Sequence, residues 1–339
     1  MKEICDAIEK KLTDNKEENI KFLNEQIEKN KNNKEVLNFI YKKLFENLPE
    51  NLQDNLVRNI NQQKFEERLK EIQELIAHKK YERALDYLDM AIDKIEKVYE
   101  DDKFIYKTFH SPFEAYLYAY RRDDKNKIIK NSELDFGVFH KFRGLILNEL
   151  GRYDEAQYDF LESFKWNSMD FEAIFGYADT LYNLGFYEDY LKWNLDTLKI
   201  AYTNFSIAMC YHNIGKYYMT KKTKEDDIKA YNIISYSISF SETEYAYRDL
   251  NTICENYKMP KTIAKEKDVF KTIEKEKLPT GPDKELIIQL ITIAKSFING
   301  NDEFALFVFR IIYNLTHDEV TKQYIKAGEE AIRAKKAQK

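Results

Sequence analysis

The central part of the sequence, from Phe139 to Leu198, repeats itself at a fixed interval. Five residues of its first half have a counterpart of similar type in the second half, and each pair lies 34 residues apart, as 181 is from 147. The pairs are Leu147 with Leu181, Leu150 with Leu184, Gly151 with Gly185, Tyr153 with Tyr187, and Phe164 with Leu198. Self-similarity at this interval predicts stacked supersecondary units, each burying its apolar face against its neighbours.

The residue types around the repeat predict helices joined by short turns. The 339 residues include only 9 Gly and 5 Pro, whereas Lys, Glu, Leu and Ile are abundant. So few helix breakers in a long chain favour helices, and no alternating strand pattern persists beyond a few residues. We therefore expect an all-α fold.

The repeated units resemble the helix-turn-helix units of the tetratricopeptide repeat (TPR) family, bacterial type. The first good unit follows the family pattern at Gly144, Leu147, Gly151, Tyr153, Ala156, Phe160 and Phe164, and the second at Ala178, Leu181, Gly185, Tyr187 and Leu198. The second unit departs at Tyr190, where the family has a small residue, and at Asn194. A weaker unit has Lys79 in the place of Gly151. The resemblance implies a TPR-like α-α superhelix (solenoid) with extra N- and C-terminal helices.

Helix-breaking residues and interruptions of the 34-residue interval divide the chain into four parts. We expect an N-terminal helical region at 1–64, a TPR-like array at 65–257 with an irregular helix pair at about 98–136, a linker at 258–284, and a degenerate TPR-like helical hairpin at 285–339. The linker is indicated by three prolines and leaves room for one short amphipathic helix. In the hairpin, Gly300 and Ala305 have the spacing of Gly151 and Ala156.

Two local patterns predict helix starts. Asp14, three residues before Glu17, is a candidate N-cap, and Ser111-Pro112-Phe113-Glu114 combines an N-cap serine, a first-turn proline and a glutamate at the third position. The apolar faces of the C-terminal hairpin must meet the array, a further C-terminal helix or a second protomer. A homodimer through this hairpin is therefore one alternative, and a hairpin that covers the array is another.

Charge and composition limit the possible partners and the cellular compartment. Lys plus Arg number 54 against 59 for Asp plus Glu, a formal net charge of −5, which argues against a nucleic-acid partner. Three widely spaced cysteines, Cys5, Cys210 and Cys254, favour a reducing compartment. The charged first thirty residues lack a signal-peptide core, and the run Leu286–Ala294 is too short to span a membrane. We expect a cytoplasmic protein without a membrane partner.

Motifs for catalysis, nucleotide binding or metal binding are missing from the sequence. It contains no GxxxxGK[ST], GxGxxG, HExxH or paired CxxC, and its five histidines lack ligand spacing. The adjacent pair His110-Ser111 is better explained by helix capping than by nucleophilic catalysis, because no third member is evident. We therefore expect no cofactor, no metal and no enzymatic activity, and an enzyme of unknown class is the weakest alternative.

The resemblance further implies a concave groove lined by the first helix of each unit. The family's groove positions fall on Lys141, Leu145 and Asn148, then Phe175, Asp179 and Tyr182, then His212, Lys216 and Met219. Of these, the candidate binding residues are Lys141, Asn148, Phe175, Asp179, Tyr182, His212 and Lys216. The family's carboxylate clamp is absent, because it needs Asn where Leu145 and Asp179 stand.

Two functions follow from this resemblance. The first is a non-enzymatic scaffold or adaptor that binds a protein or peptide in the groove. The alternative is a peptide-responsive sensor-regulator that acts by protein–protein contact, similar to TPR proteins that answer signalling peptides in Gram-positive bacteria.

Overall fold

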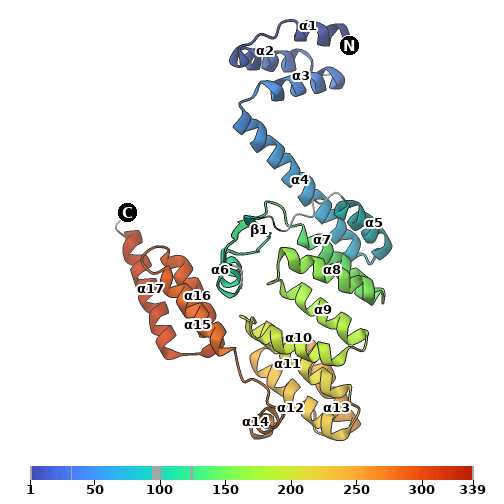
Figure 1. Ribbon diagram of the computed structural model, residues 1–339, viewed down its shortest axis with the longest axis vertical. Helices are drawn as coiled ribbons and strands as arrows, with labels where there is room; N and C mark the ends of the chain where they lie inside the picture. The colour runs from blue at the N-terminus through green and yellow to red at the C-terminus, as the bar shows by residue number, and fades with distance from the viewer. Residues whose placement is uncertain (1, 32, 94–99, 101, 123–124, 338–339) are drawn as a thin grey trace. The chain divides into compact units, whose positions relative to one another are not determined.

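The protein's structure, a computed structural model, describes residues 2–31, 33–93, 100, 102–122 and 125–337 (Figure 1). The described chain is mostly helical, and its only sheet has two strands. By its internal contacts the chain divides into two compact units, Met1–Glu74 and Leu75–Lys339. The expected all-α class is confirmed, and neighbouring helices pack in series as in an α-solenoid.

The first unit contains a small helical bundle with its own core. Its helices are α1 (Lys2–Glu9), α2 (Lys16–Lys29), α3 (Lys34–Asn47) and most of α4 (Glu50–Ala77). The core of the first three helices consists of Ile8, Leu23, Val36 and Ile40. The N-cap of α2 is Asn15, whose side chain accepts from the backbone N–H groups of Glu17 and Glu18, and not the expected Asp14. Asp and Asn are both good N-cap residues, so the sequence pattern located the start of α2 to within one residue.

The second unit is built mainly from helices that pack in the order of the chain. Their bounds are α5 (Tyr81–Ile92), α7 (Gly137–Glu149), α8 (Tyr153–Trp166), α9 (Phe171–Asn183), α10 (Tyr187–Leu198), α11 (Asn204–Met219), α12 (Lys224–Phe240) and α13 (Glu244–Asn256). From α7 to α13 each helix contacts the next, as the succession from green to yellow in Figure 1 shows. Hairpins that bury their faces on one another account for the repeat seen in the sequence.

The glycines of the repeat act at turns and at a close helix contact. Gly151 and Gly185 have positive φ angles, +74° and +79°, just after the ends of α7 and α9. Such left-handed residues end helices and are usually glycine. Gly144 and Gly176 make room for Phe160, because a Cβ atom at either position would lie within 2.9 Å of its ring. Phe160 on α8 thereby packs between α7 and α9.

A segment of mixed structure stands in place of the expected helix pair at 98–136. It contains β1 (Phe104–Lys107), α6 (Pro112–Arg121) and β2 (Ile128–Asn131), and the two strands pair in parallel, Phe104 with Ile128. Only one helix is present among its described residues, 100, 102–122 and 125–136. Strands of four residues are too short for an alternating pattern to reveal them in the sequence.

The expected linker carries a helix that packs on the array. This helix, α14 (Glu266–Lys275), contacts α12, and Asn232 Nδ2 donates a hydrogen bond of 2.8 Å to Thr272 Oγ1. It corresponds to the one short amphipathic helix that the sequence allowed in this linker. The chain that follows is tied to α11 and α12, since Tyr211 donates its hydroxyl to Pro279 O at 2.9 Å and Tyr236 Oη accepts from Gly281 N.

The C-terminal part consists of the expected hairpin and one further helix, α15 (Lys284–Ser296), α16 (Asp302–Thr316) and α17 (Glu319–Ala337). α17 packs on α16, and α15 packs on α6, where Arg121 Nη1 donates a 2.9 Å hydrogen bond to Gln289 Oε1. Asn204 Nδ2, at the start of α11, donates to Asn314 O at 3.1 Å. The apolar faces of the hairpin therefore meet a further helix and the α6 segment of the same chain.

Candidate binding face

The candidate binding residues lie on α7, α9 and α11, the first helices of three successive hairpins. We define the first-helix face as the surface that carries Lys141, Asn148, Phe175, Asp179, Tyr182, His212 and Lys216. Their contacts separate these residues into two groups. One group serves the packing of α7 against α9, and the other forms a polar and aromatic cluster on α9, α11 and α13.

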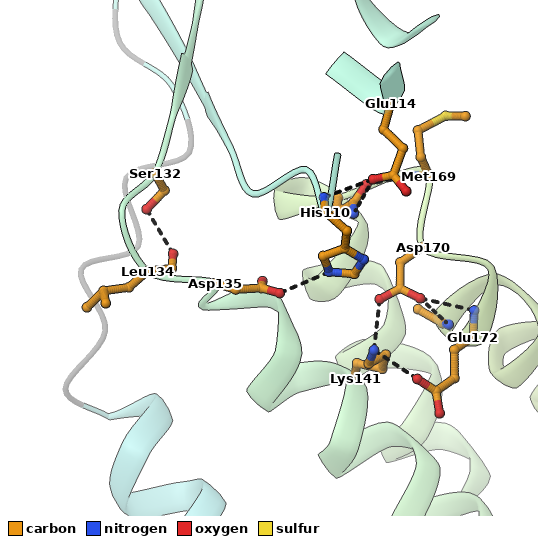
Figure 2. Close-up of polar contacts among 11 residues, drawn as sticks. His110, Glu114, Ser132, Leu134, Asp135, Lys141, Met169, Asp170 and Glu172 are labelled. Atoms are coloured by element: carbon orange, nitrogen blue, oxygen red, sulfur yellow. Dashed lines mark hydrogen bonds and ion pairs between the residues drawn. The ribbon is translucent and has the colours of Figure 1, made fainter. Parts of the chain in front are cut away.

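Lys141 belongs to an ion-pair cluster at the start of α9 (Figure 2). Its ammonium lies 3.0 Å from Asp170 Oδ2 and 2.9 Å from Glu172 Oε2, and the residue is only 7% exposed. Burial by itself lowers the pKa of Lys141, but the attraction of the two carboxylates exceeds this effect and raises it. Asp170 also caps α9. The charge of Lys141 is therefore already neutralised within the array.

Asn148 and Phe175 are likewise used for packing. Asn148 Nδ2 donates to Gly176 O at 2.9 Å, and its Oδ1 accepts from Thr180 Oγ1 at 3.0 Å, which ties α7 to α9. Phe175 is 9% exposed, and its ring centroid lies 6.0 Å from that of Phe171. Neither side chain offers a partner much surface.

The His110-Ser111 pair does not form a catalytic arrangement. Ser111 Oγ accepts from the backbone N–H of Glu114 at 3.3 Å, so it caps α6 as expected. The His110 imidazole instead faces Asp135, 3.1 Å from Nε2 to Oδ2, and this hydrogen bond is the largest cause of its raised pKa (Figure 2). The buried Glu114 carboxylate accepts from His110 N and from the hydroxyl of Tyr202. The cluster anchors the α6 segment to the array.

Asp179, Tyr182 and Lys216 form the accessible part of the first-helix face. The Lys216 ammonium lies 4.3 Å above the centre of the Tyr182 ring and 3.9 Å from Asp179 Oδ1. The Asp179 side chain is 55% exposed, yet burial is the largest cause of its raised pKa. One side of this carboxylate thus faces solvent while the surrounding helices keep water from the other, which disfavours its charged form.

His212 connects this cluster to the next helix. Its Nε2 lies 2.9 Å from Oδ2 of Asp249 on α13, and the His212 side chain is 4% exposed. Burial acts to raise the pKa of Asp249, but the His212 hydrogen bond and charge lower it overall. Sequence reasoning missed Asp249, although its spacing from the other candidate residues was a signal. His212 lies 37 residues after Phe175, and the same step from His212 leads to Asp249.

Tyr190, at a position where the resemblance expects a small residue, lies beside the same cluster. It is fully buried, its ring centroid is 5.3 Å from that of Tyr182, and its hydroxyl has no hydrogen-bond partner among the described residues. Burial, followed by the charge of Asp179, raises its pKa well above the ordinary value. His212 Nδ1 is a second buried atom without such a partner in the described chain.

The comparisons with known proteins assign no family. A scan against protein-family models and a search of curated proteins both returned no match. Within the described residues, no group of three or more His, Cys, Asp or Glu side chains is placed to hold a metal ion. None of the helices described is both long and apolar enough to cross a membrane.

Proposed function

We propose that this protein is a non-enzymatic scaffold or adaptor that binds a protein or peptide segment in a groove along the first-helix face. Support comes from the series of packed hairpins and from the resemblance of the central units to TPR units. Solenoids use extended surfaces of this kind for recognition.

One observation carries the proposal. Asp179 is 55% exposed and receives no hydrogen bond from any described residue, while Tyr182 beside it is partly buried under Lys216. By contrast, Lys141, Asn148 and the His212 Nε2 atom have partners within the array. Accessible polar groups next to aromatic rings are typical of recognition surfaces, because they combine apolar contact area with directional bonds.

A site-specific cross-linker tests this proposal. We would place p-benzoylphenylalanine at Tyr182 and, as a matched control, at Tyr158 of α8, which is 51% exposed. We expect irradiation in cell extract to yield discrete cross-linked partners from position 182 but not from 158. A Tyr182→Ala protein added in excess should not compete for these partners, whereas unaltered protein should. Equal cross-linking from both positions would contradict the proposed groove.

The second candidate is a peptide-responsive sensor-regulator that acts by protein–protein contact. It is favoured by the division into two compact units, one with a separate three-helix core and one with the first-helix face, linked through α4. In such a protein, a ligand on the second unit would change how the first unit meets its target.

Small-angle scattering distinguishes the two candidates. A peptide derived from the segment cross-linked at Tyr182 should change the radius of gyration if the protein is a sensor-regulator. An adaptor with bound peptide should keep its radius of gyration within error. A radius that stays unchanged at saturating peptide would remove the sensor-regulator from consideration.

A further inference from the structure

Asp179 is a carboxylate that lacks hydrogen-bond donors. The Lys216 ammonium is 3.9 Å from Oδ1, which exceeds hydrogen-bond distance. No described residue donates a hydrogen bond to the carboxylate, although its side chain is 55% exposed and therefore open to a ligand. A carboxylate that is partly desolvated but not hydrogen bonded gains more from a donor than a fully hydrated one does.

Lys216 is poorly placed to satisfy this carboxylate. Its ammonium lies 4.3 Å above the Tyr182 ring, and its side chain is only 21% exposed. The cation–π contact and the long ion pair share one ammonium between two acceptors. A ligand that donates more strongly can therefore replace Lys216 as the partner of Asp179, while the Lys216 ammonium stays above the Tyr182 ring.

Two buried polar atoms close to Asp179 have no hydrogen-bond partner among the described residues. Asp249 accepts this hydrogen bond, so His212 donates through Nε2. The other ring nitrogen, Nδ1, and the Tyr190 hydroxyl both lack partners in the described part of the chain, on side chains that are at least nine-tenths buried. The charges of Asp179 and Asp249 both act on the Tyr190 hydroxyl, which places all three groups in one neighbourhood.

The charge balance points in the same direction. Asp179 and Asp249 lie in the cluster, and Glu149 acts to raise the pKa of Asp179, whereas Lys216 and His212 act to lower it. A ligand carboxylate or phosphate would meet this negative charge, but a ligand with several N–H donors would complement it.

We infer that Asp179 is the receptor for a cationic group of the bound segment, either an arginine or lysine side chain or a free amino terminus. The inference rests on the proposed function, because it specifies the ligand of the same face. The cation occupies the open side of the carboxylate, and Lys216 stays above Tyr182. Asp179 therefore selects segments by charge, and the rings of Tyr182 and Tyr187, 5.6 Å apart, provide apolar contact.

Short peptides of one scaffold test the inference without knowledge of the natural partner. The probes are acetyl-Gly-Ala-X-Ala-Gly-amide with X as arginine, lysine or neutral citrulline, and the citrulline peptide with a free amino terminus. Binding is followed at low ionic strength, where charge pairs are least screened, by the NMR signal of the ¹³C-labelled Asp179 carboxyl group. The signal is assigned with the D179N protein.

We expect at least one cationic probe to move the Asp179 signal and to bind about tenfold more tightly than the acetylated citrulline peptide, as one charge-assisted hydrogen bond implies. Asp179→Asn should abolish this preference. The control Asp196→Asn, which alters a half-exposed carboxylate paired with Lys199 on α10, should preserve it. Lys216→Gln should tighten binding, because it removes the competing ammonium. Tight binding by the free-amino peptide alone would identify an amino terminus as the source.

Three outcomes overturn the inference: equal binding of charged and neutral probes, an undiminished preference in the D179N protein, or no shift of the Asp179 signal with any cationic probe. None of them decides the proposed function, which depends on cross-linking at Tyr182. Conversely, cross-linking at Tyr182 could fail while the arginine peptide is clearly preferred. Asp179 would then be a cation site without a protein partner. Circular dichroism of each variant separates loss of binding from loss of fold.

Discussion

At the scale of single residues, departures from the repeat pattern are informative. The weaker unit has Lys79 where the two good units have Gly151 and Gly185, and its φ angle of +54° is nevertheless left-handed. Its backbone also closes the same turn, because Lys80 N bonds to Leu75 O as Arg152 N bonds to Leu147 O. The backbone conformation is thus retained where the favoured residue type is not.

Lys79→Gly should stabilise the protein. A residue with a Cβ atom is strained at positive φ, and glycine removes that strain at the end of α4. Relief of about 1–2 kcal/mol of left-handed strain exceeds the roughly 0.4–1 kcal/mol lost to the freer unfolded chain, so we expect the free energy of unfolding of the second unit to rise by about 0.5–1 kcal/mol, measured by urea denaturation. Lys80→Gly is the matched control, because φ at Lys80 is −86° and suits any residue. A gain from Lys80→Gly equal to that from Lys79→Gly would contradict this explanation.

Tyr190→Phe should also stabilise the protein. The Tyr190 hydroxyl is buried without a hydrogen-bond partner in the described chain, and an unsatisfied buried polar group costs about 1–3 kcal/mol. Removing it leaves the ring in place, so we expect a gain of about 1 kcal/mol in the free energy of unfolding. Tyr211→Phe is the control that should destabilise, since the Tyr211 hydroxyl bonds to Pro279 O. A loss of stability in the Tyr190 variant would mean that a buried water satisfies the hydroxyl.

At the scale of elements, the sequence predicted the helices well but did not predict the two short strands. The 34-residue interval located α7 to α10, because turn glycines and buried positions recur with it. The strands β1 and β2 escaped prediction, because they are four residues long and pair across a gap of 24 positions, 104 with 128. Likewise, the resemblance to TPR units suggested the residues of the first-helix face. The resemblance could not show that Lys141 and Asn148 already have partners within the array, since these partners lie 29 and 28 residues away in the sequence.

The contact between His110 and Asp135 should make the stability of the second unit depend on pH. The bond to Asp135 raises the pKa of His110 above its ordinary value of 6.5, so its contribution is fully present below pH 6.5 and is lost as the pH rises through the folded-state pKa. Asp135→Asn should therefore lower stability more at pH 5.5 than at pH 8.5, as thermal melts can show. His110 is 45% exposed, so salt should weaken the effect.

A second variant separates this effect from other roles of Asp135. In a His110→Gln background the group that titrates is gone, so Asp135→Asn should have the same effect at both pH values. A pH dependence that persists in this background would assign the effect to another group.

At the scale of the whole molecule, the division into two units is the main departure from a simple array. The sequence placed the end of the N-terminal region at residue 64, whereas the division falls after Glu74. The difference arises because α4 runs without a break from Glu50 to Ala77, and a continuous helix carries no composition signal for a boundary.

Two compact units with separate cores should unfold as separate transitions. Leu23 is fully buried in the core of the first unit, and Phe160 is fully buried between α7 and α9 of the second. Leu23→Ala should lower the free energy of unfolding of the first unit by about 2–5 kcal/mol, and Phe160→Ala that of the second by about 3–5 kcal/mol. Differential scanning calorimetry should show that each variant moves one transition and leaves the other in place. If either variant shifted the whole heat-capacity profile together, α4 would transmit stability between the units and the two cores would fold as one.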